Sequence, residues 1–76
     1  MKQKPTLDEL LQPGQAVRVF WNEGNINNQI CHIRAIVDED YIVYRTWRKR
    51  HQDWYYAVRW RYWFELLHEK DVLSKA

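Results

Sequence analysis

Ten of the twelve aromatic residues of this chain fall between Tyr41 and Phe64, interleaved with six of its twelve Lys and Arg residues. Asp53 is the only acidic residue in that stretch. On folding, a chain of 76 residues buries only about 60% of its unfolded surface, less than a larger domain does, so it needs bulky side chains to build a core. Each Trp or Tyr can bury roughly 150–250 Å². The stretch therefore allows two interpretations: the core of a small β domain, or a surface of rings and cations.

Alternation with a period of two separates the residues of Trp54–Glu65 into two rows. One row is entirely apolar or aromatic, which predicts that it faces the core. Its members are Trp54, Tyr56, Val58, Trp60, Tyr62 and Phe64. The other row mixes two arginines with aromatics, which predicts an outer surface. Its members are Tyr55, Ala57, Arg59, Arg61, Trp63 and Glu65.

The rest of the chain predicts short strands with helical turns near both ends. Thr6 followed by Glu9 is typical of a capped helical turn, which Pro13-Gly14 ends, and residues 1–5 are expected to be a flexible tail. Alternation predicts strands at Gln15–Trp21, Gln29–Val37, Tyr41–Arg48 and Trp54–Trp60, with a loop at Asn22–Asn28 and a turn at Asp38–Asp40. Arg61–Leu67 continues without Gly or Pro, so either one bent strand or two short ones are expected in Trp54–Glu65. Glu69–Ser74 predicts a closing helical turn.

These elements predict a single mainly β domain over residues 1–76, built as a small five-stranded antiparallel barrel. The chain resembles the SH3-like small-barrel superfamily, which includes KOW, Tudor-type and plasmid-type modules. The resemblance rests on Pro13–Val19, Tyr56-Ala57-Val58 and Asp71-Val72-Leu73. The Tyr-Ala-Val strand is also similar to one in the plasmid-borne type II dihydrofolate reductases. Their Val-Gln-Ile-Tyr motif is missing from Arg59–Phe64, so reductase activity is not expected here.

Charge is distributed unevenly along the chain. Residues 1–44 carry four basic and six acidic side chains, whereas residues 45–76 carry eight basic and four acidic ones. This asymmetry favours an anionic partner for the second half. Cations neutralise phosphates and exposed rings stack on unpaired bases, so the sequence predicts binding of single-stranded RNA or DNA by an outer face. The candidate residues are Arg45, Trp47, Arg48, Lys49, Arg50, Tyr55, Arg59, Arg61 and Trp63.

A second interpretation uses the same residues as a contact between proteins. Trp and Arg are enriched at protein interfaces, so this face also suits a protein-interaction module or a homodimer. Nothing in the sequence predicts catalysis, a cofactor or a metal site, since the three histidines have no partners at ligand spacing. The single cysteine, Cys31, and the lack of a membrane-length apolar run favour a cytoplasmic protein that does not enter membranes. The small size suggests an accessory factor, for example of a mobile element or phage.

Overall fold

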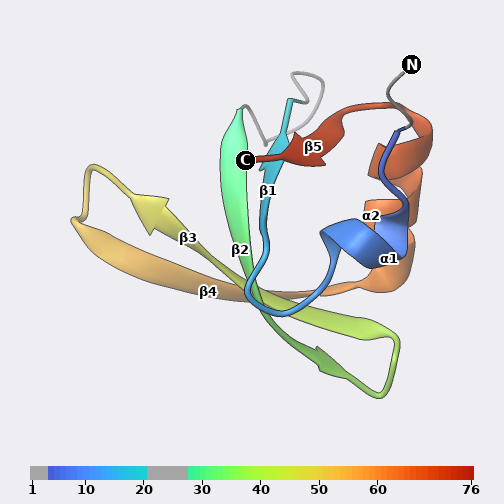
Figure 1. Cartoon of the computed structure of the whole chain (residues 1–76). Helices are drawn as coiled ribbons and strands as arrows, with labels where there is room; N and C mark the ends of the chain where they lie inside the picture. The colour runs from blue at the N-terminus through green and yellow to red at the C-terminus, as the bar shows by residue number, and fades with distance from the viewer. Residues whose placement is uncertain (1–3, 21–27) are drawn as a thin grey trace.

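A computed structural model describes residues 4–20 and 28–76 of the chain. In it, five antiparallel strands form one sheet in the order β4-β3-β2-β1-β5, and two short helices lie on one side of that sheet (Figure 1). The strands are β1 (Ala16–Val19), β2 (Gln29–Val37), β3 (Tyr41–Arg48), β4 (Asp53–Trp60) and β5 (Leu73–Lys75). The helices are α1 (Leu7–Leu10) and α2 (Arg61–Glu69). The prediction of a mainly β domain with five antiparallel strands is confirmed.

The sheet is open between its two outermost strands. Among the described residues, β4 pairs only with β3, and β5 pairs only with β1. The predicted barrel therefore takes the form of an unclosed sheet, from which the β3–β4 hairpin projects away from the helices (Figure 1). Membership of the SH3-like superfamily stays a prediction.

Capping and alternation patterns in the sequence correctly predicted α1, β2 and β3 in the first half of the chain. Thr6 Oγ1 accepts a hydrogen bond from the backbone N–H of Glu9 at 3.2 Å, as the capping pattern predicted for α1. The bounds of β2 and β3 are the predicted ones. Trp21 and most of the predicted Asn22–Asn28 loop lie outside the described residues.

The second half differs from the sequence prediction in two elements. Arg61–Glu69 is a helix, so the expected continuation of strand structure through Glu65 is wrong. Phe64 and Leu67 stand three residues apart on the buried side of this helix, which is a helical spacing that strand-like alternation obscured. The predicted C-terminal helical turn is present as α2, but it ends at Glu69 and does not span Glu69–Ser74, because Asp71 adopts a positive φ of 61° and turns the chain into β5.

The core lies between the helices and the inner side of the sheet, which we define as the side that faces the helices. α1, β1, β2, β3, α2 and β5 each contribute at least one buried apolar side chain, whereas β4 contributes only the partly buried Ala57. The buried set is Leu10, Leu11, Val17, Val19, Cys31, Ile33, Ile42, Tyr44, Phe64, Leu67 and Leu73. The domain thus depends on α2, and not on β4, to cover β3.

Phe64 is the largest fully buried side chain and fixes α2 to the sheet. Its ring contacts the ring of Tyr44 edge-on, with centroids 5.9 Å apart, and that of Trp63 with centroids 4.8 Å apart. We expect Phe64→Ala to lower the free energy of unfolding by about 3–5 kcal/mol, because it removes a buried ring and leaves a cavity. Urea denaturation followed by Trp fluorescence measures this loss.

Tyr62 provides the matched control on the same helix, since 61% of its surface is exposed. Tyr62→Ala should change the free energy of unfolding by no more than about 0.5 kcal/mol. If Phe64→Ala leaves too little folded protein, Phe64→Leu, which leaves a smaller cavity and therefore costs less, provides a measurable intermediate. Equal losses for Phe64→Ala and Tyr62→Ala would contradict the placement of α2.

Candidate functional site

The register of the β3–β4 hairpin decides which side chains of β4 face the core. Arg48 and Asp53 are direct cross-strand partners, and the Nε and one terminal nitrogen of Arg48 donate to the two Asp53 carboxylate oxygens at 2.8 and 2.7 Å. Further along, the buried residues Ile42, Tyr44 and Thr46 pair with Arg59, Ala57 and Tyr55. Directly opposite residues of an antiparallel pair share a face, so Tyr55, Ala57 and Arg59 lie on the inner side.

The opposite row of β4 lies on the outer side of the sheet. Its four residues Trp54, Tyr56, Val58 and Trp60 are 37–65% exposed. They pair with the outer row of β3, and together the two rows form what we call the outer aromatic face: Tyr41, Val43, Arg45, Trp47, Trp54, Tyr56, Val58 and Trp60. The prediction that the Trp54 row faces the core is wrong for every residue except Phe64, which α2 carries into the core.

The inversion arises because the rows were assigned by their apolar character. The wholly apolar row was expected to fill the core, whereas in the structure Phe64 and Leu67 of α2 do so. The register with β3 then places Tyr55, Ala57 and Arg59 on the inner side and the apolar row on the outer side. The alternation itself was recognised correctly, but the assignment of its two rows was reversed.

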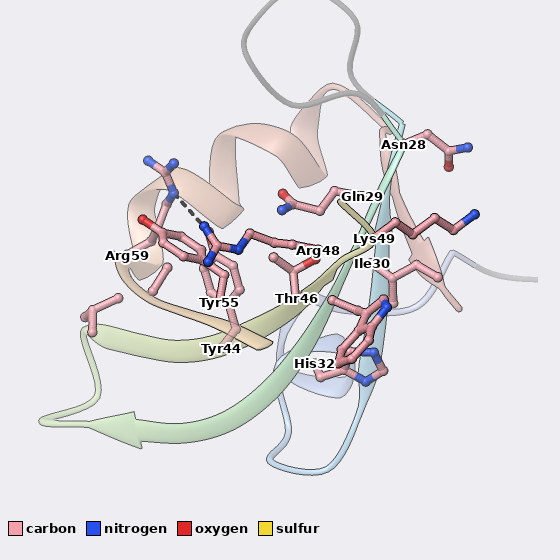
Figure 2. Close-up of a pocket in the computed structure, with 13 residues that line it drawn as sticks. Asn28, Gln29, Ile30, His32, Tyr44, Thr46, Arg48, Lys49, Tyr55 and Arg59 are labelled. Carbon is pink, nitrogen blue, oxygen red and sulfur yellow. Dashed lines mark hydrogen bonds between the residues drawn. The ribbon is translucent and has the colours of Figure 1, made fainter. Parts of the chain in front are cut away.

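A cleft of about 1130 Å³ opens on the inner side of the projecting hairpin, next to the start of β2. We call it the inner cleft. Its lining residues come from β2, β3, β4 and the hairpin turn (Figure 2). They are Asn28, Gln29, Ile30, His32, Tyr44, Thr46, Trp47, Arg48, Lys49, Tyr55, Ala57, Val58 and Arg59.

The inner cleft is positively charged. Arg48, Lys49 and Arg59 line it, and none of the described residues in its lining is acidic. Arg48 is compensated by Asp53 just outside the lining, whereas Lys49 is exposed at the hairpin turn and extends away from the other two cations (Figure 2). Opposite charges close by hold the pKa of the Asp53 carboxyl below its usual value, chiefly through the hydrogen bonds from Arg48, and they raise the pKa of Arg48 for the same reason.

Aromatic rings position two of these cations. The guanidinium carbon of Arg59 lies 4.4 Å from the ring centroid of Trp63, and its Nε donates to the Tyr44 hydroxyl at 3.2 Å. The guanidinium of Arg48 lies 5.0 Å from the ring centroid of Tyr55. Tyr55 itself is 49% exposed, so much of its ring is accessible. The cleft therefore offers fixed cations beside an accessible aromatic ring.

The structure divides the nine predicted site residues among several places. Arg48, Lys49, Tyr55 and Arg59 line the inner cleft, and Trp47 contributes to its lining from the outer row of β3. Arg50 lies exposed in the hairpin turn. The remaining members, Arg45, Arg61 and Trp63, do not line the cleft.

Of those three residues, Trp63 stacks against Arg59 from outside the lining, and the two arginines have other partners. Arg45 lies on the outer aromatic face, with its guanidinium carbon 4.0 Å from the Trp54 ring centroid. Arg61 begins α2 and forms ion pairs with Asp8 of α1 and, across one helical turn, with Glu65 at 3.5 Å. The two ion pairs compensate the charge of Arg61. The predicted single patch that joined Arg45 and Trp47 to Arg59 and Trp63 on the outer surface is therefore wrong.

Sequence reasoning missed the outer aromatic face as a surface. Its rings contact one another edge-on: the centroids of Trp47 and Trp54 are 5.2 Å apart, and those of Tyr41 and Trp60 are 6.3 Å apart. One terminal nitrogen of Arg45 donates to the hydroxyl of Tyr56 at 3.1 Å, while its buried Nε has no hydrogen-bond partner among the described residues. The one signal in the sequence for this register was Asp53, the acidic residue that follows the basic run Arg48–Arg50 and can pair with Arg48 across a hairpin.

The described residues offer little for metal or nucleophilic chemistry. No group of three or more His, Cys, Asp or Glu side chains in residues 4–20 and 28–76 is arranged to hold a metal ion. Burial raises the pKa of the Cys31 thiol to about 12, which leaves it protonated and weakly nucleophilic near neutral pH. No helix in the described parts of the chain is long and apolar enough to cross a membrane.

Comparisons of this chain with protein-family models, curated proteins and solved structures found no match.

Stability should fall at alkaline pH because of two buried titratable groups, Cys31 and Tyr44. Burial raises the pKa of Cys31 from 9.0 to about 12 and also raises that of Tyr44 above 10.0. A raised folded-state pKa means that the unfolded chain loses its proton first, so stability is complete below the unfolded pKa values and declines above them. We expect the urea midpoint to fall between about pH 8 and about pH 11.

Cys31→Ala is the control, because it removes the thiol and with it part of the alkaline loss. The variant should be less stable than the wild type near neutral pH, and its midpoint should depend less on pH. A wild-type midpoint that stays constant over this pH range would contradict the burial of both groups.

Proposed function

We propose that this chain is a non-enzymatic accessory protein that binds single-stranded RNA or DNA in the inner cleft, in the cytoplasm. The observation that carries the proposal is the composition of the cleft: three cations, no acid among its described lining residues, and the half-exposed ring of Tyr55. Nucleic-acid surfaces for unpaired strands combine these same two components, a positively charged groove and rings on which bases stack.

Each component has a separate physical role. Lys49 and Arg59 neutralise backbone phosphates and release counterions, which makes affinity depend strongly on salt and little on sequence. Tyr55 stacks on an unpaired base, an interaction worth roughly 1–3 kcal/mol. Asn28, Gln29 and Thr46 add polar groups to the lining that suit sugar hydroxyls and base edges.

The shape of the site favours a single strand over a duplex. Duplex readers insert a helix or a β-ribbon into a groove. Here the candidate cations and the ring line a concave surface. The ligand must therefore enter the cleft of the protein, whereas a duplex reader inserts its own helix or ribbon into the nucleic acid. A single strand whose bases are unstacked fits that geometry.

Removing the free cations or the ring should weaken binding in distinguishable ways. We expect Lys49→Gln combined with Arg59→Gln to lower affinity and to reduce the slope of log affinity against log salt, by about 0.7 for each lost phosphate contact. Tyr55→Ala should lower affinity by about 1–3 kcal/mol while leaving that slope unchanged. Fluorescence anisotropy with labelled single-stranded RNA and DNA at several salt concentrations measures both quantities.

Lys75→Gln serves as the matched control, since Lys75 is an exposed cation of β5 outside the cleft lining. It should affect binding less than Lys49→Gln does. The proposal fails if the wild type does not bind single strands at low salt, or if Lys75→Gln weakens binding as much as the cleft variants do.

Asp53→Asn should have the opposite effect on affinity. Asp53 compensates Arg48 through the two hydrogen bonds described above, so its neutralisation adds one free positive charge to the cleft. We expect tighter binding and a steeper salt dependence, with little loss of stability because the ion pair is exposed to solvent. Asp71→Asn, which removes the exposed partner of Lys4, is the control and should leave binding unchanged. Weaker binding by Asp53→Asn would show that Asp53, and not the charge of the cleft, matters for the ligand.

A further inference from the structure

β4 is an uncovered sheet edge, and it is a long one. It has eight residues, and its only strand partner among the described residues is β3. Every second residue along it therefore directs a backbone N–H and C=O away from the sheet. Such an edge is a template on which another extended strand can pair.

The two edges of the same sheet differ in how they are protected. β5 is three residues long and carries Lys75, which matches the short, charged edges by which proteins prevent unwanted pairing. β4 is less protected: its eight residues contain no Pro, Gly or Lys, its charged residues Asp53 and Arg59 lie near its two ends, and it pairs with β3 in an unbroken register without a bulge. Among the described residues, the edge formed by β4 is therefore the more available of the two.

The side chains along β4 are also those of an interface. The outer row is apolar and aromatic, and Val58 and Trp60 are 60% and 65% exposed. The adjoining outer row of β3 adds the exposed rings of Tyr41 and Trp47 to the same surface. Contiguous apolar surfaces of this kind mark sites of protein interaction.

We propose that β4 pairs antiparallel with the β4 strand of a second copy of this chain, which joins two five-stranded sheets into one. A second copy is the occupant because the strand is complementary to itself. Two-fold symmetric pairing centred on any residue preserves the inner and outer faces, and the two registers that pair most of β4 are those centred on its middle residues, Tyr56 and Ala57.

Both registers produce favourable cross-strand pairs. Centred on Ala57, the outer row places Trp54 opposite Trp60 and Tyr56 opposite Val58, while the inner row places Tyr55 opposite Arg59. Centred on Tyr56, Trp54 lies opposite Val58 and Asp53 opposite Arg59. Aromatic pairs, aromatic–β-branched pairs and opposite charges are the combinations that stabilise paired strands.

The pairing is a property separate from the proposed binding of nucleic acid, but it would place two binding clefts side by side. A two-fold axis perpendicular to the sheet keeps both inner clefts on the same side, with the two Tyr55 rings and Arg59 cations flanking the shared junction. One strand of nucleic acid then meets two cleft sites in succession. The pairing itself needs no nucleic acid, so it is tested without any.

Light scattering over micromolar to millimolar protein concentrations measures the association. We expect a reversible dimer of the wild type, and at least about a tenfold weaker dimer for Val58→Glu, which places a charge opposite an aromatic ring in either register. Tyr62→Glu is the matched control, because Tyr62 is equally exposed at 61% but lies on α2. A wild type that stays monomeric throughout, or a dimer that Val58→Glu leaves unchanged, would overturn the proposal.

Disulfide trapping identifies the pairing strand and its register. Residues on the two-fold axis have Cα atoms about 4.5–5.5 Å apart, within the range that a disulfide spans. Ala57→Cys should therefore cross-link in one register and Tyr56→Cys in the other, as seen on a non-reducing gel. The native Cys31 is buried, so it should not form cross-links itself. Val37→Cys, at an exposed position on β2, is the negative control. Cross-linking at neither position, or equally at Val37→Cys, would refute pairing through β4.

Discussion

The ion pair between Arg48 and Asp53 closes the β3–β4 hairpin, and the rest of the surface depends on the register that it marks. In that register Asp53 is the first residue of β4, Tyr55 and Arg59 lie on the inner side, and the tryptophans of β4 lie on the outer side. An exposed ion pair contributes little to stability, so the register is held by the whole set of cross-strand pairs between β3 and β4. A shift of one residue in that pairing would exchange the two faces of the strand.

This register separates the cations of the cleft from most of the aromatic rings, although the two kinds of side chain alternate in the sequence. The cations of the cleft, Arg48 and Arg59, lie on the helix side with Tyr55 between them, whereas most of the rings lie outside. The core does not need those outer rings, because α2 covers β3 with Phe64 and Leu67. One hairpin thus presents a charged concave surface on one side and an aromatic surface on the other.

The sequence predicted those elements whose signals are local. The Thr6 cap, the β2 and β3 bounds and the burial of Cys31 and Ile33 follow from capping and alternation within a few residues. The bulge near Arg34 could not be predicted, and it turns Val37 to the exposed side although Val37 alternates in step with Ile33. Alternation also cannot say which of two rows is buried. For β4 that choice depended on a hairpin register and on a helix that competes for the same core, and both are properties of the tertiary structure.

The pairing of β1 with β5 has a consequence for the way in which the chain folds. The β2–β3 and β3–β4 hairpins join neighbouring segments, so their contacts form over short loops. Val17 and Lys75, by contrast, are brought together from near opposite ends of the sequence, and Leu73 enters the core only when that pairing forms. Closing so long a loop costs more conformational entropy than closing a hairpin. We therefore expect the slowest productive step of folding to be the arrival of the last strand beside the first, after a hairpin core already exists to receive it.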